Sequence, residues 1–247
     1  MKEEIISVRN LVAKYGDKTI LEGITAGFFP EEVTIILGGS GCGKTTLLKS
    51  ILRLHEPTSG SIKIFGQEVT NMDEPEFDQL LKKIGMLFQN GALLNSVSVF
   101  DNVLIPLEQH TNLPGEITEK MIKVKLGLVN LQEATFLLPS ELSGGMKKRA
   151  ALARAIALDP VILFCDEPSA GLDPLSSASL DELILKLKEQ LKMTMVIVTH
   201  ELASIHRIAD RIIFLDKGKV LFSGTLKEAK SSRVPEVKTF FEVGQVK

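Results

Sequence analysis

The spacing of hydrophobic residues along the chain predicts which segments form strands and which form helices. Between residues 1 and 37, the stretches IISVRNLVAKYG, KTILEGITAGF and VTIIL are separated by glycines and charges, which is typical of short β-strands. After residue 43 the leucines and isoleucines of KTTLLKSILRLHE recur with helical spacing, and SIKIFG after the turn PTSG predicts another strand. The first third of the chain is therefore expected to be rich in β-structure around one helix.

From about residue 90 to residue 160 the pattern becomes helical, in SVFDNVLIPLEQH, GEITEKMIKVKLGL and GGMKKRAALARAIAL. Pro106 is expected to kink or end the first of these helices. The apolar strands VILFCDEP and MTMVIVTH then flank the amphipathic helix SLDELILKLKEQLK, and RIIFLDKGKVLFSG predicts a closing hairpin. Alternating strands and helices predict an α/β fold with a mostly parallel, buried sheet and a helical insert.

Composition excludes several classes of protein. The 247 residues are 44% hydrophobic and 24% charged, which suits one large soluble domain or two small ones, and the net charge of -2 argues against nucleic acid as the main partner. The two cysteines, Cys42 and Cys165, provide neither a disulfide scaffold nor a zinc site. The polar N-terminal stretch and the shortness of every apolar run predict neither a signal peptide nor a spanning helix. If the protein works at a membrane, we expect another chain to hold it there.

The stretch GGSGCGKTT, between a predicted strand and a predicted helix, has the pattern of a phosphate-binding loop. Phosphate oxygens must approach the backbone closely, so small side chains and successive N–H groups are needed there. The nucleotide-binding residues expected from this loop are Gly38, Gly39, Ser40, Gly41, Cys42, Gly43, Lys44, Thr45 and Thr46. Lys44 is expected to reach the β- and γ-phosphates, and the Thr45 hydroxyl to coordinate Mg²⁺.

The end of the apolar strand VILFCDEP provides two adjacent carboxylates. Asp166 is placed to hold a water bound to Mg²⁺, and Glu167 to polarise the attacking water as a general base. Alone, such a pair is more often a cap at the end of a strand. The phosphate-binding loop upstream favours the catalytic interpretation.

The stretch LSGGM begins a long Ala-rich, basic helix. Ser143 could be an ordinary N-cap, but Gly144 and Gly145 each lower helix propensity by about 1 kcal/mol relative to alanine. They are explained if a ligand must touch the backbone at this helix N-terminus, where N–H groups favour anions. For Lys147, Lys148 and Arg149 we expect a solvated basic face.

In this order and spacing, GGSGCGKTT, LSGGM and VILFCDEP resemble the nucleotide-binding subunits of ABC transporters over nearly the whole chain. The resemblance implies a P-loop NTPase fold, with a RecA-like core, an N-terminal antiparallel β subdomain and an inserted α-helical signature subdomain. It implies one ABC nucleotide-binding domain over 1–247, with its core in 1–89 and 160–230, helices in about 90–159 and a tail in 231–247. The implied cofactors are ATP and Mg²⁺.

The remaining family motifs can be placed residue by residue. Tyr15 resembles the aromatic residue that stacks on adenine, although a strand aromatic that covers the core is the alternative. Gln89 resembles the glutamine that contacts Mg²⁺ and senses the γ-phosphate, and Asp173 resembles the aspartate at the subunit interface. His200 resembles the histidine that touches the γ-phosphate, although alone it would more often be structural. The resemblance thus implies Glu167, His200 and Lys44 as catalytic residues, and Thr45, Gln89 and Asp166 around the metal.

The family also implies partners. Its nucleotide-binding subunits pair head to tail, so Ser143, Gly144 and Gly145 would cap the ATP held by a second copy of this chain. The usual signature ends in glutamine, and Met146 cannot replace its hydrogen bonds.

The stretches MLFQNGALLNSVSVFDNVLIPLEQHTNLP and LPSELSGGMKKRAALARAIALDP are similar to the ATPase subunits of the MCE-associated (Mla) phospholipid transport systems of bacteria. This implies a peripheral protein on the cytoplasmic face of the inner membrane, working with an integral permease. An importer of small solutes such as amino acids, a non-transport cell-envelope complex, and a soluble ABC protein acting on nucleic acid or the ribosome are the alternatives.

Two apolar segments are expected to contact other surfaces. Residues Leu93, Leu94, Val97, Val99 and Phe100 suit a contact with the permease, although about half of them could belong to the core. Val234, Val237, Phe240 and Phe241 fall on one face of a short helix and are expected to dock on a folded surface, such as the partner subunit.

Overall fold

The computed structural model describes residues 3–243, and the chain divides into two compact units. The first unit comprises residues 1–77 and 194–247, and the second comprises residues 78–193. Residues 1, 2 and 244–247, the last of which belong to the predicted tail, lie outside the described residues.

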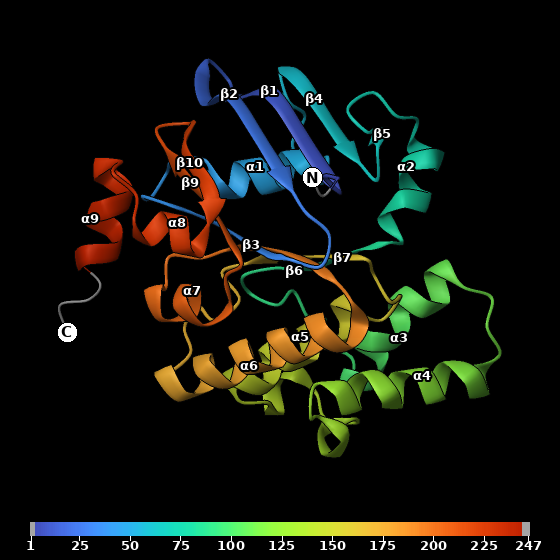
Figure 1. The fold of residues 1–247 in the computed structure, drawn as a ribbon. Coiled ribbons are helices and arrows are strands. Elements are labelled where there is room, and N and C mark those ends of the chain that lie inside the picture. The colour runs from blue at the N-terminus through green and yellow to red at the C-terminus, as the bar shows by residue number, and fades with distance from the viewer. Residues whose placement is uncertain (1–2, 244–247) are drawn as a thin grey trace. The chain divides into compact units, whose positions relative to one another are not determined.

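The first unit contains an antiparallel sheet with the strand order β2-β1-β4-β5, as Figure 1 shows. Its strands are β1 (Ile6–Tyr15), β2 (Lys18–Phe28), β4 (Ser59–Ile64) and β5 (Gln67–Glu68). Buried residues alternate with exposed ones along β1, as expected for a sheet with one covered face.

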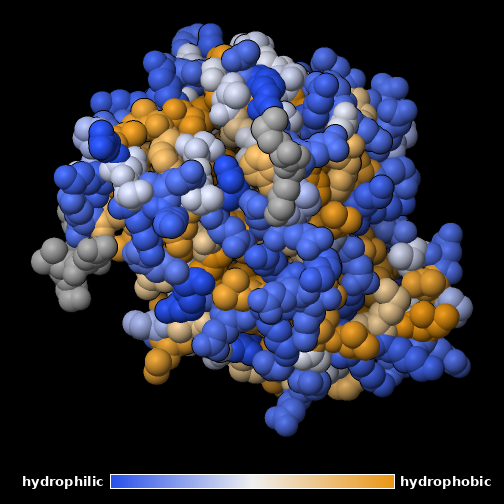
Figure 2. Space-filling view, in the orientation of Figure 1, coloured by the Kyte–Doolittle hydropathy of each residue, from blue (hydrophilic) through white to orange (hydrophobic). Residues whose placement is uncertain are grey.

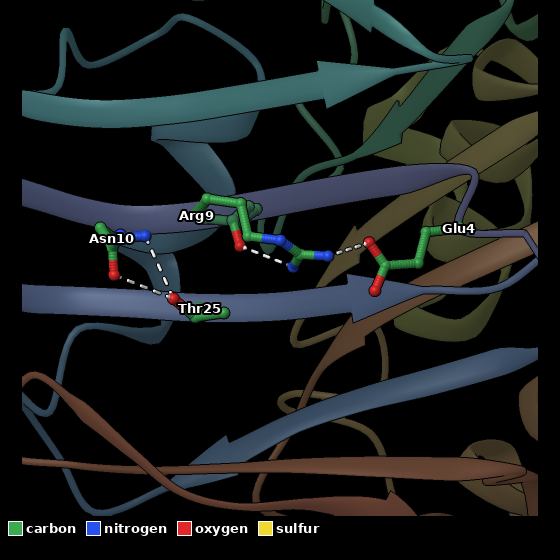
Figure 3. A network of polar contacts seen from close by, with 5 residues as sticks. Glu4, Arg9, Asn10 and Thr25 are labelled. Carbon is green, nitrogen blue, oxygen red and sulfur yellow. Dashed lines mark hydrogen bonds and ion pairs between the residues drawn. The ribbon is translucent and has the colours of Figure 1, made fainter.

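A bulge in β1 changes which residues face the core. Ile6 and Val8 are buried before it, whereas Leu11 and Ala13 are buried after it, so the buried positions shift from even to odd numbers. Asn10 lies at the bulge with φ of 49°, and its backbone N–H donates to Thr25 Oγ1 at 3.1 Å (Figure 3). The Thr25 hydroxyl in turn donates to Asn10 Oδ1 at 3.4 Å. Further register shifts with β2 follow between Leu11 and Val12 and between Ala13 and Lys14.

A second group of strands in the first unit has the order β10-β9-β3-β8. These strands are β3 (Val33–Gly38), β8 (Thr194–Val198), β9 (Arg211–Asp216) and β10 (Lys219–Thr225). Strand β3 is parallel to both β8 and β9, while β9 and β10 form the predicted antiparallel hairpin. Every residue of β3 and β8 is buried, as parallel strands covered on both faces require.

The helices of the first unit include α1, which contacts β1, β2 and β3. They are α1 (Lys44–Ile51), α7 (Leu202–Ile208), α8 (Leu226–Lys230) and α9 (Pro235–Val243), and α2 (Glu74–Leu81) spans the boundary between the units. Helix α1 ends at Ile51, several residues before the end of the predicted helical stretch.

Helix α9 docks on its own unit. Val237 and Phe241 are buried, and Figure 1 shows α9 (red) beside α8. The Phe240 ring lies 5.9 Å from that of Phe214 in β9, and the Phe241 ring 5.8 Å from that of His206 in α7. Val237, Phe240 and Phe241 of the predicted apolar face thus dock on a folded surface, which belongs to the same chain and not to a partner subunit, and Val234 precedes the helix.

The second unit is mostly helical, around the parallel strand pair β6 (Ile84–Leu87) and β7 (Ile162–Asp166). Its helices are α3 (Val99–His110), α4 (Gly115–Leu128), the 3₁₀ helices η1 (Gln132–Ala134) and η2 (Pro139–Glu141), α5 (Gly144–Ala155) and α6 (Pro174–Leu191). Helix α5 packs against α3, α4 and α6 (Figure 1). None of the helices in residues 3–243 is long and apolar enough to cross a membrane.

Two expectations for this unit require correction. Of the two outcomes expected at Pro106, a kink or an end, the structure excludes the end, because Leu107 beyond it is fully buried and helix α3 continues to His110. Lys148 is not part of a solvated face, because its side chain is buried under neighbouring loops. Arg149 is half-buried and donates to the Val129 carbonyl and to Ser179 Oγ, whereas Lys147 is exposed as expected.

Candidate nucleotide-binding site

The Gly-rich loop of the first unit connects β3 to α1 in a conformation that depends on two glycines. Gly38 has φ of 150°, and a Cβ there would lie 2.0 Å from the Leu215 carbonyl oxygen. Gly43 caps α1 with φ of 106°, and a Cβ there would lie 2.5 Å from Leu21 Cδ2. No side chain fits at either position without movement of the backbone or core. The sequence therefore needs glycine at these positions to make the turn itself.

The backbone at Gly39 and Gly41 in the middle of the loop is not covered by other parts of the chain. A Cβ built on Gly39 or Gly41 would meet no atom within 4 Å. Glycine at these two positions leaves the backbone uncovered, as the close approach of phosphate oxygens requires. Lys44 Nζ donates to the carbonyl oxygens of Gly38 at 3.0 Å and Gly39 at 2.9 Å, so its ammonium group lies over the same loop. The residues present fit a bound nucleotide phosphate.

Strand pairing places His200 at the same sheet edge as this loop. In the parallel pair β3 and β8, Ile36 lies opposite Val198. Both strands end within two residues of that position. Strand β3 continues into the Gly-rich loop, and β8 continues toward His200, which is exposed. Ligands bind at the carboxyl ends of parallel strands in folds of this type.

Tyr15 is 49% exposed at the end of β1, so it does not serve as a core aromatic. One face of its ring stacks on the His55 ring, with centroids 4.3 Å apart and an interplanar angle of 28°. The ring is thus held in place while a large part of its surface remains accessible for stacking.

In the second unit, the strand pair β6 and β7 brings Gln89 and Glu167 to one edge. Leu87 lies opposite Cys165, and Gln89 and Glu167 each follow two residues later. Asp166 is the last residue of β7 and is half-buried. Glu167 has φ of 47°, an uncommon conformation for a residue with a side chain, which turns the chain sharply after the strand.

The signature residues begin α5, as predicted. Ser143 is the N-cap, and its Oγ accepts a hydrogen bond from the Met146 backbone N–H at 3.3 Å. A Cβ on Gly144 or Gly145 would make only ordinary contacts, at 3.6 Å to Leu172 and 3.8 Å to Ser176. Packing within this chain therefore does not require glycine at either position.

Asp173 has a structural role that the sequence analysis did not anticipate. It is the N-cap of α6, and its Oδ1 accepts from the backbone N–H groups of Leu175 and Ser176, both at 3.0 Å. A hydrogen bond from the Ser176 side chain and these backbone bonds lower the pKa of the Asp173 carboxyl. The side chain is exposed, so capping leaves it accessible from outside.

Helix α5 holds the loop that contains Gln89 through two basic side chains that sequence reasoning missed. Lys148 Nζ donates to the Gln89 carbonyl oxygen, and Arg154 donates to the carbonyls of Gly91 at 2.9 Å and Ala92 at 2.8 Å. Burial lowers the pKa of both Lys148 and Arg154. The sequence places both residues on one predicted helix, but it does not indicate that they contact the loop around Gln89.

Asn102 is the other missed residue. It is fully buried on α3, accepts from the Leu94 backbone N–H at 2.8 Å, and donates to the Leu94, Ser98 and Val97 carbonyls at 3.1, 2.9 and 3.4 Å. These bonds shape the segment that follows Gln89. Of the apolar residues expected to contact the permease, Val99 at the start of α3 is buried in the core, whereas Leu94 is 48% exposed.

The fold and these motifs define an ATP-binding cassette. Residues 21–170 match the family model described as ABC transporter. The chain belongs to this family, and it is an ABC ATPase with the predicted P-loop NTPase fold.

Three known proteins illustrate the similarity. The chain is 40% identical to the intermembrane phospholipid transport system ATP-binding protein MlaF of Haemophilus influenzae, covering 98% of this chain and 92% of the relative. It is 37% identical to a probable ribonucleotide transport ATP-binding protein, mkl, of Mycobacterium leprae, covering 95% and 68%. It is also similar to the dimeric cassette MJ0796 in a post-hydrolysis state bound to ADP and phosphate, with a TM-score of 0.81, 30% identity and coverage of 90% and 98%.

No cluster of three or more His, Cys, Asp or Glu side chains that could hold a metal occurs among residues 3–243. The oxygen donors that the resemblance assigns to Mg²⁺ are the Thr45 hydroxyl in the first unit and the Asp166 carboxylate and Gln89 amide in the second. Oxygen donors are what Mg²⁺ prefers, and it keeps several waters or phosphate oxygens when bound to proteins. Each unit therefore offers the type of donor atom that Mg²⁺ prefers.

Proposed function

We propose that this chain is the ATP-hydrolysing subunit of a bacterial transporter that moves phospholipids between membranes. The observation that carries the proposal is the 40% identity over 98% of the chain to a phospholipid transport ATPase. The chain would work as a peripheral subunit on the cytoplasmic face of the inner membrane, bound to an integral permease of the MCE-associated type. Residues 90–159 would form its signature subdomain, between core segments 1–89 and 160–230.

Each nucleotide-binding residue has a role in this proposal. Tyr15 stacks on adenine, the loop from Gly38 to Thr46 binds the phosphates, and Lys44 and His200 stabilise charge on the γ-phosphate. Glu167 accepts a proton from the attacking water. Thr45 and Gln89 would hold Mg²⁺, with Asp166 holding a water bound to it, and the ion would supply positive charge beside the phosphates.

Two copies of the chain would pair head to tail, as supported by the dimeric relative. Ser143, whose Oγ accepts from its own helix, retains its hydroxyl proton to donate to the partner's γ-phosphate. Gly144 and Gly145 offer uncovered backbone beside it, and Asp173 would lie at the subunit interface. The Met146 side chain takes no part in this contact.

A hollow beside Gln89 is the proposed contact for the permease. It occupies about 450 Å³ in the second unit and is lined by Phe88, Ile105, Pro106, His110 and Arg154, among others. Hydrophobic and basic groups together suit an amphipathic cytoplasmic helix of a membrane protein. Leu93, Leu94 and Val97 lie in the segment between Gln89 and helix α3.

Paired mutants test the shared site. Lys44→Ala and Ser143→Arg each spoil both sites of a homodimer, but a heterodimer of the two rebuilds one intact site if the signature serves the neighbour. Occlusion of one ATP per purified heterodimer is expected, and a contact of this oxyanion type is worth about 3 kcal/mol. A heterodimer that occludes no nucleotide would show that the signature serves its own chain.

The substrate requires a separate experiment. The purified complex with its permease should retain phospholipids detectable by mass spectrometry and transfer them between vesicles in an ATP-dependent manner. The relative described as a probable ribonucleotide transporter supports the alternative of a small-solute importer. ATP-dependent uptake of a small solute without lipid transfer would favour that alternative.

A further inference from the structure

Lys148 is buried where a lysine is costly. Only 8% of its surface is exposed, although Lys147, the preceding residue of α5, is exposed. Desolvation lowers the pKa of the Lys148 ammonium, while the nearby Cys165 and Glu167 act in the opposite direction. Burying a charged group carries a desolvation cost that good polar contacts must offset. An apolar side chain of similar length would avoid this cost, so the polar contacts of Lys148 need an explanation.

The contacts of Lys148 join two loops. Its Nζ donates to the Gln89 carbonyl oxygen and lies 3.5 Å from the Glu167 carbonyl oxygen. Both loops leave the same edge of the β6–β7 pair, and Glu167 does so with a positive φ. A positive charge between the two carbonyls fixes how far apart the loops lie and stabilises the turned backbone of Glu167.

Lys148 also belongs to the signature helix. It lies five residues after Ser143, on the helix whose N-terminal residues Ser143 and Gly144 are exposed. Arg154, farther along α5, donates to the carbonyls of Gly91 and Ala92 in the Gln89 loop. Lys148 is the residue of α5 whose described contacts reach both the Gln89 loop and Glu167.

We propose that Lys148 is a positioning residue for ATP hydrolysis, which ties the backbones of Gln89 and Glu167 to the signature helix of the same chain. It does not touch the nucleotide. As a consequence of this tie, contact between the signature helix and the ATP bound by the partner subunit sets the position of Glu167. Glu167 is the general base for the ATP bound by its own chain. This inference rests on the proposed roles of Glu167 and Ser143.

The test compares Lys148→Met, Lys148→Arg and the matched control Lys147→Met in the complete complex with its permease. Lys148→Met removes the N–H donors of the side chain and keeps its length. We expect kcat to fall about tenfold or more, because a charged hydrogen bond that positions a reacting group is lost. The dissociation constant for ATP without Mg²⁺ should change less than twofold. Lys148→Arg keeps a charged donor and should recover a substantial part of kcat, and Lys147→Met should match the wild type.

Two readouts separate positioning from general stability. Thermal unfolding and hydrogen exchange of segments 88–92 and 166–170 are measured on each variant, and local exchange should rise in Lys148→Met without a matching loss of ATP affinity. If Lys148→Met does not fold, Lys148→Ala, which introduces no bulk, replaces it. A kcat equal to that of Lys147→Met in the folded variant would overturn the proposal. Glu167→Gln is assayed in parallel, because normal turnover there would overturn the proposed function instead.

Discussion

Asn102 offers a sharp test of how the segment after Gln89 is held. The side chain is fully buried and makes one hydrogen bond as acceptor and three as donor, all to the backbone of residues 94–98. Replacement by alanine leaves the Leu94 N–H and carbonyl without these partners. An unsatisfied buried donor or acceptor costs about 1–3 kcal/mol, and entering water would relieve part of it. We therefore expect Asn102→Ala to destabilise this segment by about 3 kcal/mol.

Hydrogen exchange followed by mass spectrometry measures the effect where it occurs. A loss of about 3 kcal/mol corresponds to a roughly hundredfold faster exchange of the Leu94 amide, since each 1.4 kcal/mol is about a factor of ten. The matched control is Asn95→Ala, because Asn95 lies in the same segment and is exposed. That change should leave urea unfolding within about 0.5 kcal/mol of the wild type. Equal exchange in the two variants would refute the reasoning, because it would show that the buried hydrogen bonds do not hold the segment.

Three further predictions concern other parts of the chain. Glu167→Gln should reduce the rate of hydrolysis about 10²–10⁴-fold with ATP affinity retained, because the general base is lost while the phosphate-binding loop is untouched. Phe241→Ala should destabilise the first unit by about 3 kcal/mol in urea unfolding, because the ring is buried against His206, whereas the exposed Lys238→Ala should have little effect. Burial raises the pKa of the Cys165 thiol to about 12, so at pH 8 the thiolate fraction is about one in ten thousand, and iodoacetamide should modify Cys165 only after unfolding. Because the unfolded thiol ionises near its ordinary pKa of 9.0, this group should lower stability progressively as pH rises above 9.

Each of these has an opposing result. Near-normal turnover of Glu167→Gln would remove that residue from its role as base. Equal unfolding curves for Phe241→Ala and Lys238→Ala would show that α9 contributes nothing to the fold. Alkylation of Cys165 in the native protein at the rate seen in denaturant would show that the strand β7 opens readily.

The candidate site was largely predictable because its motifs are local. A phosphate-binding loop depends on glycines within nine residues, and its requirement for uncovered backbone can be recognised without knowing the rest of the chain. The cap at Ser143 follows equally from neighbouring residues. Lys148 was not predictable, because Lys147 and Lys148 differ by only about 100° around the helix axis. Which of them is buried depends on the distant loops at Gln89 and Glu167.

Asn102 carried a weak signal that could have been used. It lies between Val99 and Val103, at helical spacing on an apolar face, where an asparagine needs hydrogen-bond partners. The sequence indicates that such partners must exist, but it does not say that they belong to the backbone of residues 94–98.

The sequence by itself determined most of the strands and helices, although not, for example, α2, β6 or α7. It also determined the phosphate-binding loop and the hydrophobic face of α9, because each depends on the spacing of side chains over a few residues. Tertiary structure decided the rest. Packing of α3 against α5 carries the helix through Pro106, since the burial of Leu107 offsets the lost backbone hydrogen bond. Pairing of β1 with β2 and β4 places the bulge at Asn10, which moves the buried positions from Ile6 and Val8 to Leu11 and Ala13. These outcomes depend on contacts between residues distant in the chain, which local spacing does not encode.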